Sequence, residues 1–247
     1  PLIRDIDKIA AKNLLWDKIL CVSNSVCEDV HSTGVDIDKI ITAYPGTDTK
    51  KFNSKPGKKW LRSRIDVKDD EIIILYAGRI MNNDEILEDK GISTLLKAFS
   101  IVAENNKNVK LLIAAAMPRE EYKENFNKVI EKIQNKAKLL NIGNKVIIKS
   151  FQLDEMPFVY NGADIFAMAS KHEAFGLVYT EAMACGLPVI GTSIGGIPEV
   201  ITNAKEGYLI QPDEPAELAK RIEWLIKDLS LIHISEPTRP LYISYAV

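Results

Sequence analysis

Two glutamates on either side of a glycine are the residues of this sequence best suited to chemistry. Glu173 and Glu181 stand eight residues apart, with Gly176 between them. A glycine lets the backbone approach a ligand closely, and the start of a helix offers free amide groups and a partial positive charge to a phosphate. Carboxylates suit sugar and ribose hydroxyls, because each can accept two hydrogen bonds. The pair could therefore bind hydroxyls of the two sugar rings that flank a diphosphate. Glutamates at this spacing also arise by chance in an acidic chain.

The pattern around these residues predicts the elements that would position them. Short apolar runs predict buried strands at 19–22, 40–44, 72–77, 109–115, 146–148, 164–169, 188–191 and 208–210. Amphipathic stretches between them predict helices, including a long one opened by Pro118, one at 176–185 and a closing one at 216–229. This alternation indicates an α/β fold with a doubly wound parallel sheet. Ligands of such sheets bind at the carboxyl ends of the strands, which is where Glu173 is expected.

Composition limits the class of protein. The 247 residues carry 32 basic and 34 acidic side chains, a formal net charge of −2, and 46% of them are hydrophobic. These values are ordinary for a soluble globular chain and give no reason to expect nucleic acid as a partner. The sequence shows neither an apolar run of membrane-spanning length nor a secretory signal. Three cysteines without metal-ligand spacing fit a reducing compartment, so a cytoplasmic location is expected.

A longer pattern surrounds the two glutamates. Residues 170–190 read Ser-x-x-Glu-Ala-Phe-Gly-Leu-Val-x-x-Glu-Ala-Met-Ala-Cys-Gly-Leu-Pro-Val-Ile, and Gly-Gly-Ile-Pro-Glu-Val follows at 195–200. This stretch closely resembles family-four retaining glycosyltransferases of the two-Rossmann-domain (GT-B) fold, and mostly their C-terminal domain. The resemblance extends to Tyr-Pro-Gly-Thr-Asp at 44–48, Ala-Gly-Arg-Ile at 77–80, Lys-Gly at 90–91 and Ala-Asp-Ile-Phe at 163–166.

The resemblance implies a role for each matching residue. Arg79 and Lys90 would bind the donor diphosphate and stabilise the charge that builds on the leaving group. Glu173 would hold hydroxyls of the transferred sugar and complete the catalytic set with the two cations. Glu181 would hold the ribose hydroxyls. The remaining donor-binding residues would be the backbone at Ala174, Phe175, Gly176 and Leu177, near the sugar and the distal phosphate, and Phe151, Gln152 and Leu153, which would border the base.

Ordinary structural interpretations stand beside these roles. Arg79 would be a surface loop cation, Lys90 a residue at a helix start, and the base-bordering residues plain loop packing. The loop between Arg79 and Lys90 is longer than the family's, and we expect it to bulge outward and leave Lys90 in place. Acid-x-acid pairs at 5–7 and 36–38 have the form of a divalent-metal site, but they are expected in solvated turns, so neither a metal nor another cofactor is predicted. Glu199 is expected to be a helix-end charge.

The resemblance also divides the chain. Residues 1–40 look like the end of the N-terminal acceptor domain with the interdomain segment, and residues 41–230 like the nucleotide-sugar-binding Rossmann-like domain. Residues 231–247 fit neither the helical nor the strand period of apolar residues. They resemble the translation of a synthetic sequencing adapter, so they are predicted to be a non-native tail that packs poorly.

Two functions follow from the resemblance. The first is a hexosyltransferase-like enzyme that moves a sugar from a nucleoside-diphosphate sugar, its substrate, to a glycan, lipid or small-molecule acceptor with retention of configuration. The second is a truncated donor-binding domain that holds nucleotide without turnover, because water exclusion and acceptor positioning need the closed cleft. A related two-domain epimerase is a third interpretation, which the glutamate loop matches less well. Membrane association of the full-length parent is left open.

Overall fold

A six-stranded parallel sheet is the centre of the larger domain. The computed structural model describes residues 16–80, 86–202, 204 and 207–227. The strands lie in the order β5-β4-β3-β6-β7-β8. Their bounds are β3 (Ile72–Gly78), β4 (Val109–Ala116), β5 (Val146–Phe151), β6 (Ile165–Ala167), β7 (Val189–Thr192) and β8 (Gly207–Ile210). Numbered within this domain the order is 3-2-1-4-5-6, that of a dinucleotide-binding Rossmann sheet, and it confirms the predicted doubly wound α/β fold.

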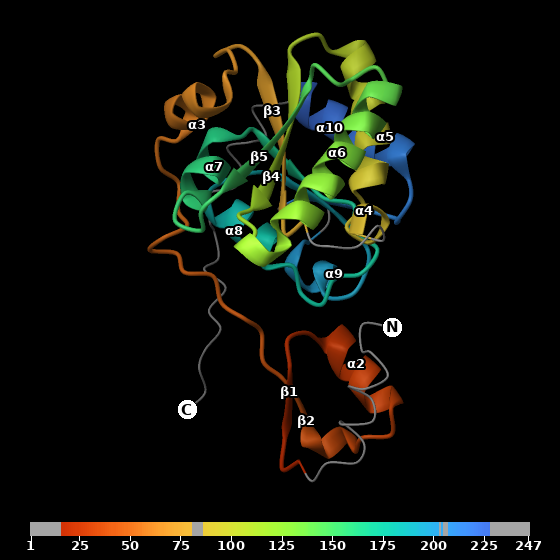
Figure 1. Ribbon diagram of the computed structural model, residues 1–247. Helices are drawn as coiled ribbons and strands as arrows, with labels where there is room; N and C mark the ends of the chain where they lie inside the picture. Colours follow the sequence, from red (N-terminus) through yellow and green to blue (C-terminus); the bar gives the residue numbers. More distant parts are fainter. Residues whose placement is uncertain (1–15, 81–85, 203, 205–206, 228–247) are drawn as a thin grey trace.

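Helices cover both faces of the sheet. Figure 1 shows α5, α6 and α10 on one side of the sheet and α3 and α7 on the other. The helices are α3 (Lys58–Ile65), α4 (Ile86–Asp89), α5 (Ile92–Asn105), α6 (Lys123–Leu139), α7 (Met156–Gly162), α8 (Leu177–Ala184), α9 (Ile197–Val200) and α10 (Pro215–Lys227). Because both faces are covered, β3 is buried from Ile73 to Ala77, as its unbroken apolar run predicts.

A small N-terminal unit, residues 16–42, precedes this domain in the chain. It contains β1 (Ile19–Cys21), α2 (Asn24–Ser32), the 3₁₀ turn η1 (Ile37–Lys39) and β2 (Ile40–Thr42). Its two strands pair in parallel, and Cys21, Val30 and Val35 form its core. Figure 1 shows the unit joined to α3 by an extended segment. Because β2 pairs with β1, residues 41 and 42 belong to this unit rather than to the Rossmann-like domain.

The structure differs from the sequence prediction at the long helix. Pro118 does not open α6, which begins at Lys123 after a short 3₁₀ turn, η2 (Glu120–Tyr122). Arg119 has an extended backbone, with ψ at 154°, so the chain turns before the helix can start. A proline is compatible with the first helical turn, but it does not compel one.

The short helices α3 and α7 were not predicted. Each has eight residues or fewer, too few to show a clear apolar period, and α7 contains Pro157 and ends at Gly162. They pack on each other, and the rings of Trp60 and Phe158 lie 5.3 Å apart between centroids. Their stability therefore depends on tertiary packing more than on local propensity.

A buried ion pair ties α3 to the sheet. Asp164, which precedes β6, accepts hydrogen bonds from the Ile73 amide at 2.9 Å and from Arg62 at 3.3 Å, and Lys58 approaches it at 2.8 Å. Asp164 and Arg62 are 7% and 5% exposed. This network aligns the start of β3 with β6, and so sets the ends of the two strands beside each other.

Candidate functional site

One cleft of about 590 Å³ opens where four strands end. It is lined from the carboxyl ends of β3, β4 and β5 and from the loop that follows β6. In the sheet β3 and β6 are neighbours, although β4 and β5 lie between them along the chain. The loops after β3 and β6 therefore lead to opposite faces, which makes their junction the topological switch point where doubly wound sheets bind ligands.

Two cations line this cleft. Arg79 directly follows β3 and is exposed. Lys90 follows α4 and extends its ammonium group to 3.0 Å from the Glu173 carboxylate. Residues 81–85 of the predicted outward bulge lie outside the described residues, but Arg79 and Lys90 share one cleft in spite of the long loop between them.

Glu173 lies in the loop between β6 and α8. Its side chain is 18% exposed, and its ion pair with Lys90 holds the carboxylate at the cleft wall. The backbone beside Lys90 is also held closely. Gly91 has a left-handed backbone with φ at 65°, and a Cβ there would overlap the carbonyl oxygen of Ala169. Only glycine fits this contact, which keeps Lys90 next to the loop after β6.

Helix α8 begins at the cleft without a cap from a side chain. Its N-cap residue Gly176 has φ at 98°, and the first turn contains no acidic residue. Gly176 and Leu177, together with Ala174 and Phe175 before them, line the cleft. An uncapped helix start beside two cations is an arrangement that favours an anion.

Glu181 lies on the first turns of α8 and faces the same cleft. Its carboxylate accepts a hydrogen bond from the Tyr160 hydroxyl at 2.9 Å. Burial raises the pKa of Glu181, and the Tyr160 hydrogen bond and the charge of Lys51 oppose this rise. Tyr160 is fully buried, and its ring packs between those of Phe52 and Phe166. One carboxylate oxygen is thus held by a rigid partner, and the carboxylate keeps further capacity for a ligand hydroxyl.

Several apolar side chains line the cleft. Phe151, Leu153 and Met156 line it with Ala114 and Ala116 of β4. Leu153 is 74% exposed, so it offers apolar surface to a ligand. Gln152 is exposed and is not among the residues that line the cleft. Its backbone amide donates to the Glu155 carboxylate at 2.9 Å.

The structure therefore brings ten of the eleven predicted site residues to one cleft, all except Gln152. It also adds residues that the sequence did not indicate. Tyr160 and Met156 come from the unpredicted helix α7, and Val22 and Pro45 come from the N-terminal unit and the segment after it. The sequence around Tyr160 does not indicate a role in the site, because its partner Glu181 is 21 residues away along the chain.

Comparison with known proteins places this chain in a family. The family model described as "Glycosyl transferases group 1" matches residues 58–235, most of the chain. The chain belongs to the glycosyl transferases group 1 family. Its sheet and flanking helices are those of a Rossmann-like half of the GT-B fold, as the sequence predicted.

Relatives of this group 1 chain are considerably longer. An uncharacterized glycosyltransferase of Methanocaldococcus jannaschii is 31% identical over 216 residues, which cover 85% of this chain and 51% of the relative. The N-acetyl-alpha-D-glucosaminyl L-malate synthase of Bacillus anthracis is 30% identical over 215 residues, with 87% and 51% covered. The chain spans about half the length of these curated relatives.

Solved structures agree with the fold of this group 1 chain. HepE from Anabaena, solved in complex with UDP-glucose, superposes with a TM-score of 0.78 at 22% identity, over 93% of this chain and 59% of HepE. At this identity the likeness shows the fold alone. Within the described part of the chain, no helix has the length and apolar character to cross a membrane, and no three His, Cys, Asp or Glu side chains are grouped to hold a metal ion.

Proposed function

We propose that this chain forms the donor half of a retaining glycosyltransferase, which moves a hexose-like sugar from a nucleoside-diphosphate sugar to an acceptor. The cleft carries this proposal: Arg79, Lys90, Glu173 and Glu181 line it together around the start of α8. Several of its relatives are named glycosyltransferases, and HepE was solved with UDP-glucose. Retention of configuration rests on the resemblance of the 170–190 segment to family-four enzymes.

The charges of the cleft suit a diphosphate leaving group. Arg79 can bind phosphate oxygens with a planar fork, and Lys90 adds a compact point charge. The uncapped start of α8 adds amide donors on the same side. These groups stabilise negative charge as the bond from sugar to phosphate breaks, without a metal ion. A chelator is accordingly expected to leave nucleotide affinity unchanged.

The two glutamates divide the hydroxyls between them. Glu181, held by Tyr160, accepts from the ribose. Glu173, paired with Lys90, accepts from the transferred sugar. The apolar surface at Phe151 and Leu153 borders the base. We place the reaction in the cytoplasm, where the cysteines of the chain stay free thiols.

A second function is suggested by the part of the relatives that is matched. The match covers about half of each relative, whose other half would supply the acceptor side of such a cleft. Water exclusion and acceptor positioning need both sides. In this alternative, the chain binds the donor nucleotide and does not turn it over by itself. The acceptor, whether glycan, lipid or small molecule, and any membrane contact would then depend on the full-length parent.

Calorimetry with uridine, guanosine and adenosine diphosphates tests the site. One of the three should bind, and Arg79→Ala and Glu181→Ala should each weaken it about tenfold or more, because a hydrogen bond to a charged group contributes about 1.5–3 kcal/mol. Arg119→Ala is the matched control, since its side chain is 84% exposed and does not line the cleft.

Product analysis separates the two functions. Transfer from a radiolabelled sugar nucleotide would identify an enzyme, whereas tight nucleotide binding without transfer supports the donor-binding module. If the folded chain binds none of the three nucleotides, or if Arg79→Ala and Glu181→Ala bind as tightly as the wild type, the proposed site is wrong.

A further inference from the structure

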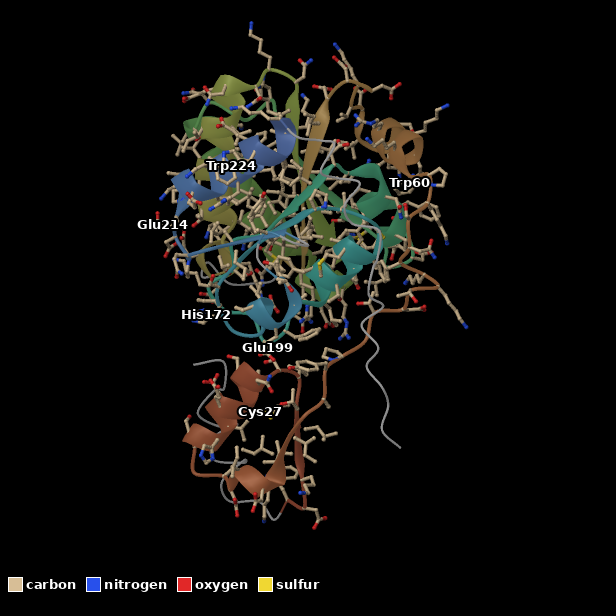
Figure 2. All side chains as sticks on the ribbon, turned by 180° about the vertical axis from the view of Figure 1, so that it is seen from behind. Cys27, Trp60, His172, Glu199, Glu214 and Trp224 are labelled. Carbon is tan, nitrogen blue, oxygen red and sulfur yellow. The ribbon has the colours of Figure 1, made fainter. Side chains whose placement is uncertain are left out.

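Glu199 connects the larger domain to the N-terminal unit. It lies on α9, and Figure 1 shows α9 directly above α2 of the unit. One carboxylate oxygen accepts from the Asn24 backbone amide at 2.9 Å, and the other from the Ser25 backbone amide at 3.1 Å. In Figure 2, Glu199 stands on the face of the larger domain that is turned toward the unit. A side chain 174 residues away in sequence thus caps the start of α2.

This cap completes the first turn of α2. The amides at the start of a helix have no partner within it, and a side chain or water must satisfy them. In α2, the Ser23 hydroxyl accepts from the Val26 amide and the Ser23 carbonyl from the Cys27 amide. Glu199 accepts from the two backbone amides before Val26, those of Asn24 and Ser25. The first turn of α2 contains no acidic residue of its own, so Glu199 also supplies the negative charge that the helix start favours.

A hydroxyl network extends the contact to the segment after β2. The Tyr44 hydroxyl donates at 2.8 Å to the Glu199 oxygen that also accepts from the Asn24 backbone. The side-chain amide of Asn24 donates to the Tyr44 hydroxyl at 2.8 Å. Thr42 in turn donates to Asn24 at 2.7 Å. The start of α2 and the segment after β2 therefore meet at one carboxylate, and Thr42 at the end of β2 joins the network through Asn24.

The same contact reaches the glutamate loop. The Gly196 amide, at the start of α9, donates to the Glu173 carbonyl at 3.2 Å. A Cβ on Gly196 would lie 2.9 Å from the Cβ of Ser23, so the unit packs closely against this turn. The ring of Tyr44 lies 5.8 Å from that of Phe175 in the loop. The unit thus packs on the Gly196 turn, which is hydrogen-bonded to the glutamate loop, and the segment after the unit packs on Phe175 of that loop.

We propose that Glu199 is a positioning residue that docks the N-terminal unit on the donor loop, and so completes the wall of the cleft formed by Val22 and Pro45. Val22 directly precedes the capped start of α2, and Pro45 directly follows Tyr44. Both ends of this wall are therefore held through one side chain. Its effect on donor binding rests on the function proposed above, whereas the docking does not.

Amide hydrogen exchange, resolved by NMR on the whole chain, tests the docking. In Glu199→Gln, which keeps the shape and removes the charge, the Asn24 and Ser25 amides should exchange about tenfold faster or more. Amides of β3 and β4 should keep their rates. Glu28→Gln is the matched control, because it removes the same charge from an exposed site on α2 itself and should leave both amides protected.

Donor affinity supplies a readout that a merely structural role would not change. The uridine, guanosine or adenosine diphosphate that binds the wild type should bind Glu199→Gln about tenfold more weakly, at an unchanged melting temperature of the larger domain. Tyr44→Phe, which keeps the carboxylate cap and the Phe175 contact, should show a smaller loss.

The outcomes separate the two proposals. Equal exchange in Glu199→Gln and wild type overturns the docking, and faster exchange with full nucleotide affinity overturns the positioning role. If the wild type binds no nucleotide, the proposed function fails, and the exchange rates alone decide the docking: faster exchange supports it and equal exchange overturns it.

Discussion

Tyr160→Phe is the perturbation whose effect the structure defines most sharply. The variant removes one hydroxyl that donates to Glu181 at 2.9 Å and leaves the ring between its aromatic neighbours Phe52 and Phe166. Tyr160 is fully buried, so water cannot readily replace the lost donor. The Glu181 carboxylate then stays partly buried with one fewer hydrogen bond.

The expected loss follows from the charge of the acceptor. A hydrogen bond to an ionised group contributes about 1.5–3 kcal/mol, so the free energy of unfolding should fall by about that amount at pH 8. Burial already raises the pKa of Glu181, and the Tyr160 hydrogen bond lowers it, so the pKa should rise further in the variant. A carboxyl group with a raised folded pKa destabilises the fold as pH rises through that pKa. The loss should therefore be full at pH 8 and smaller at pH 5, because the lower pH approaches the raised pKa of Glu181.

Urea unfolding at the two pH values measures the effect in the wild type, Tyr160→Phe, Glu181→Gln and the double variant. Tyr179→Phe is the matched control, because Tyr179 is equally buried but donates to the Met168 carbonyl at 3.0 Å. A carbonyl does not titrate, so the control should lose about 1 kcal/mol without the same pH dependence.

Two results would refute this reasoning. One is a coupling energy between Tyr160→Phe and Glu181→Gln within about 0.5 kcal/mol of zero, since residues in contact should depart from additivity. The other is an equal loss at pH 5 and pH 8, which would mean that the carboxylate charge does not determine the strength of the bond.

Two further predictions concern the elements that hold the cleft. Gly91→Ala should lower the free energy of unfolding by about 3 kcal/mol or more, because it adds a side chain to a left-handed backbone and overlaps the Ala169 carbonyl. Gly46→Ala, with nothing within 4 Å of the added atom, is its control in thermal unfolding. Asp164→Ala should lose about 3–5 kcal/mol, because it leaves the buried Arg62 guanidinium without its carboxylate. An Asp164→Ala chain that unfolds at the wild-type urea concentration would contradict this.

Much of the larger domain was predictable, because its signals are local. The unbroken apolar run of β3 predicts a central parallel strand, and the strand is buried at every position from 73 to 77. The 170–190 pattern predicts a loop, a glycine at a helix start and a glutamate on that helix, and α8 begins directly after Gly176. Pro118 misled the prediction of α6, because a proline permits a helix start at a position where the adjacent backbone is extended.

From the sequence alone came the order of the strands and of the longer helices, together with the residue types of the glutamate loop, since periodicity and spacing are properties of short segments. The sequence could not specify what each buried face packs against. The meeting of Arg79 with Lys90, the hydrogen bond from Tyr160 to Glu181, and the cap that Glu199 places on α2 were decided only by the tertiary structure. The two hydrogen-bonded contacts join segments 21 and 175 residues apart along the chain, and a polar side chain finds such a partner only after the sheet has set its neighbours in space.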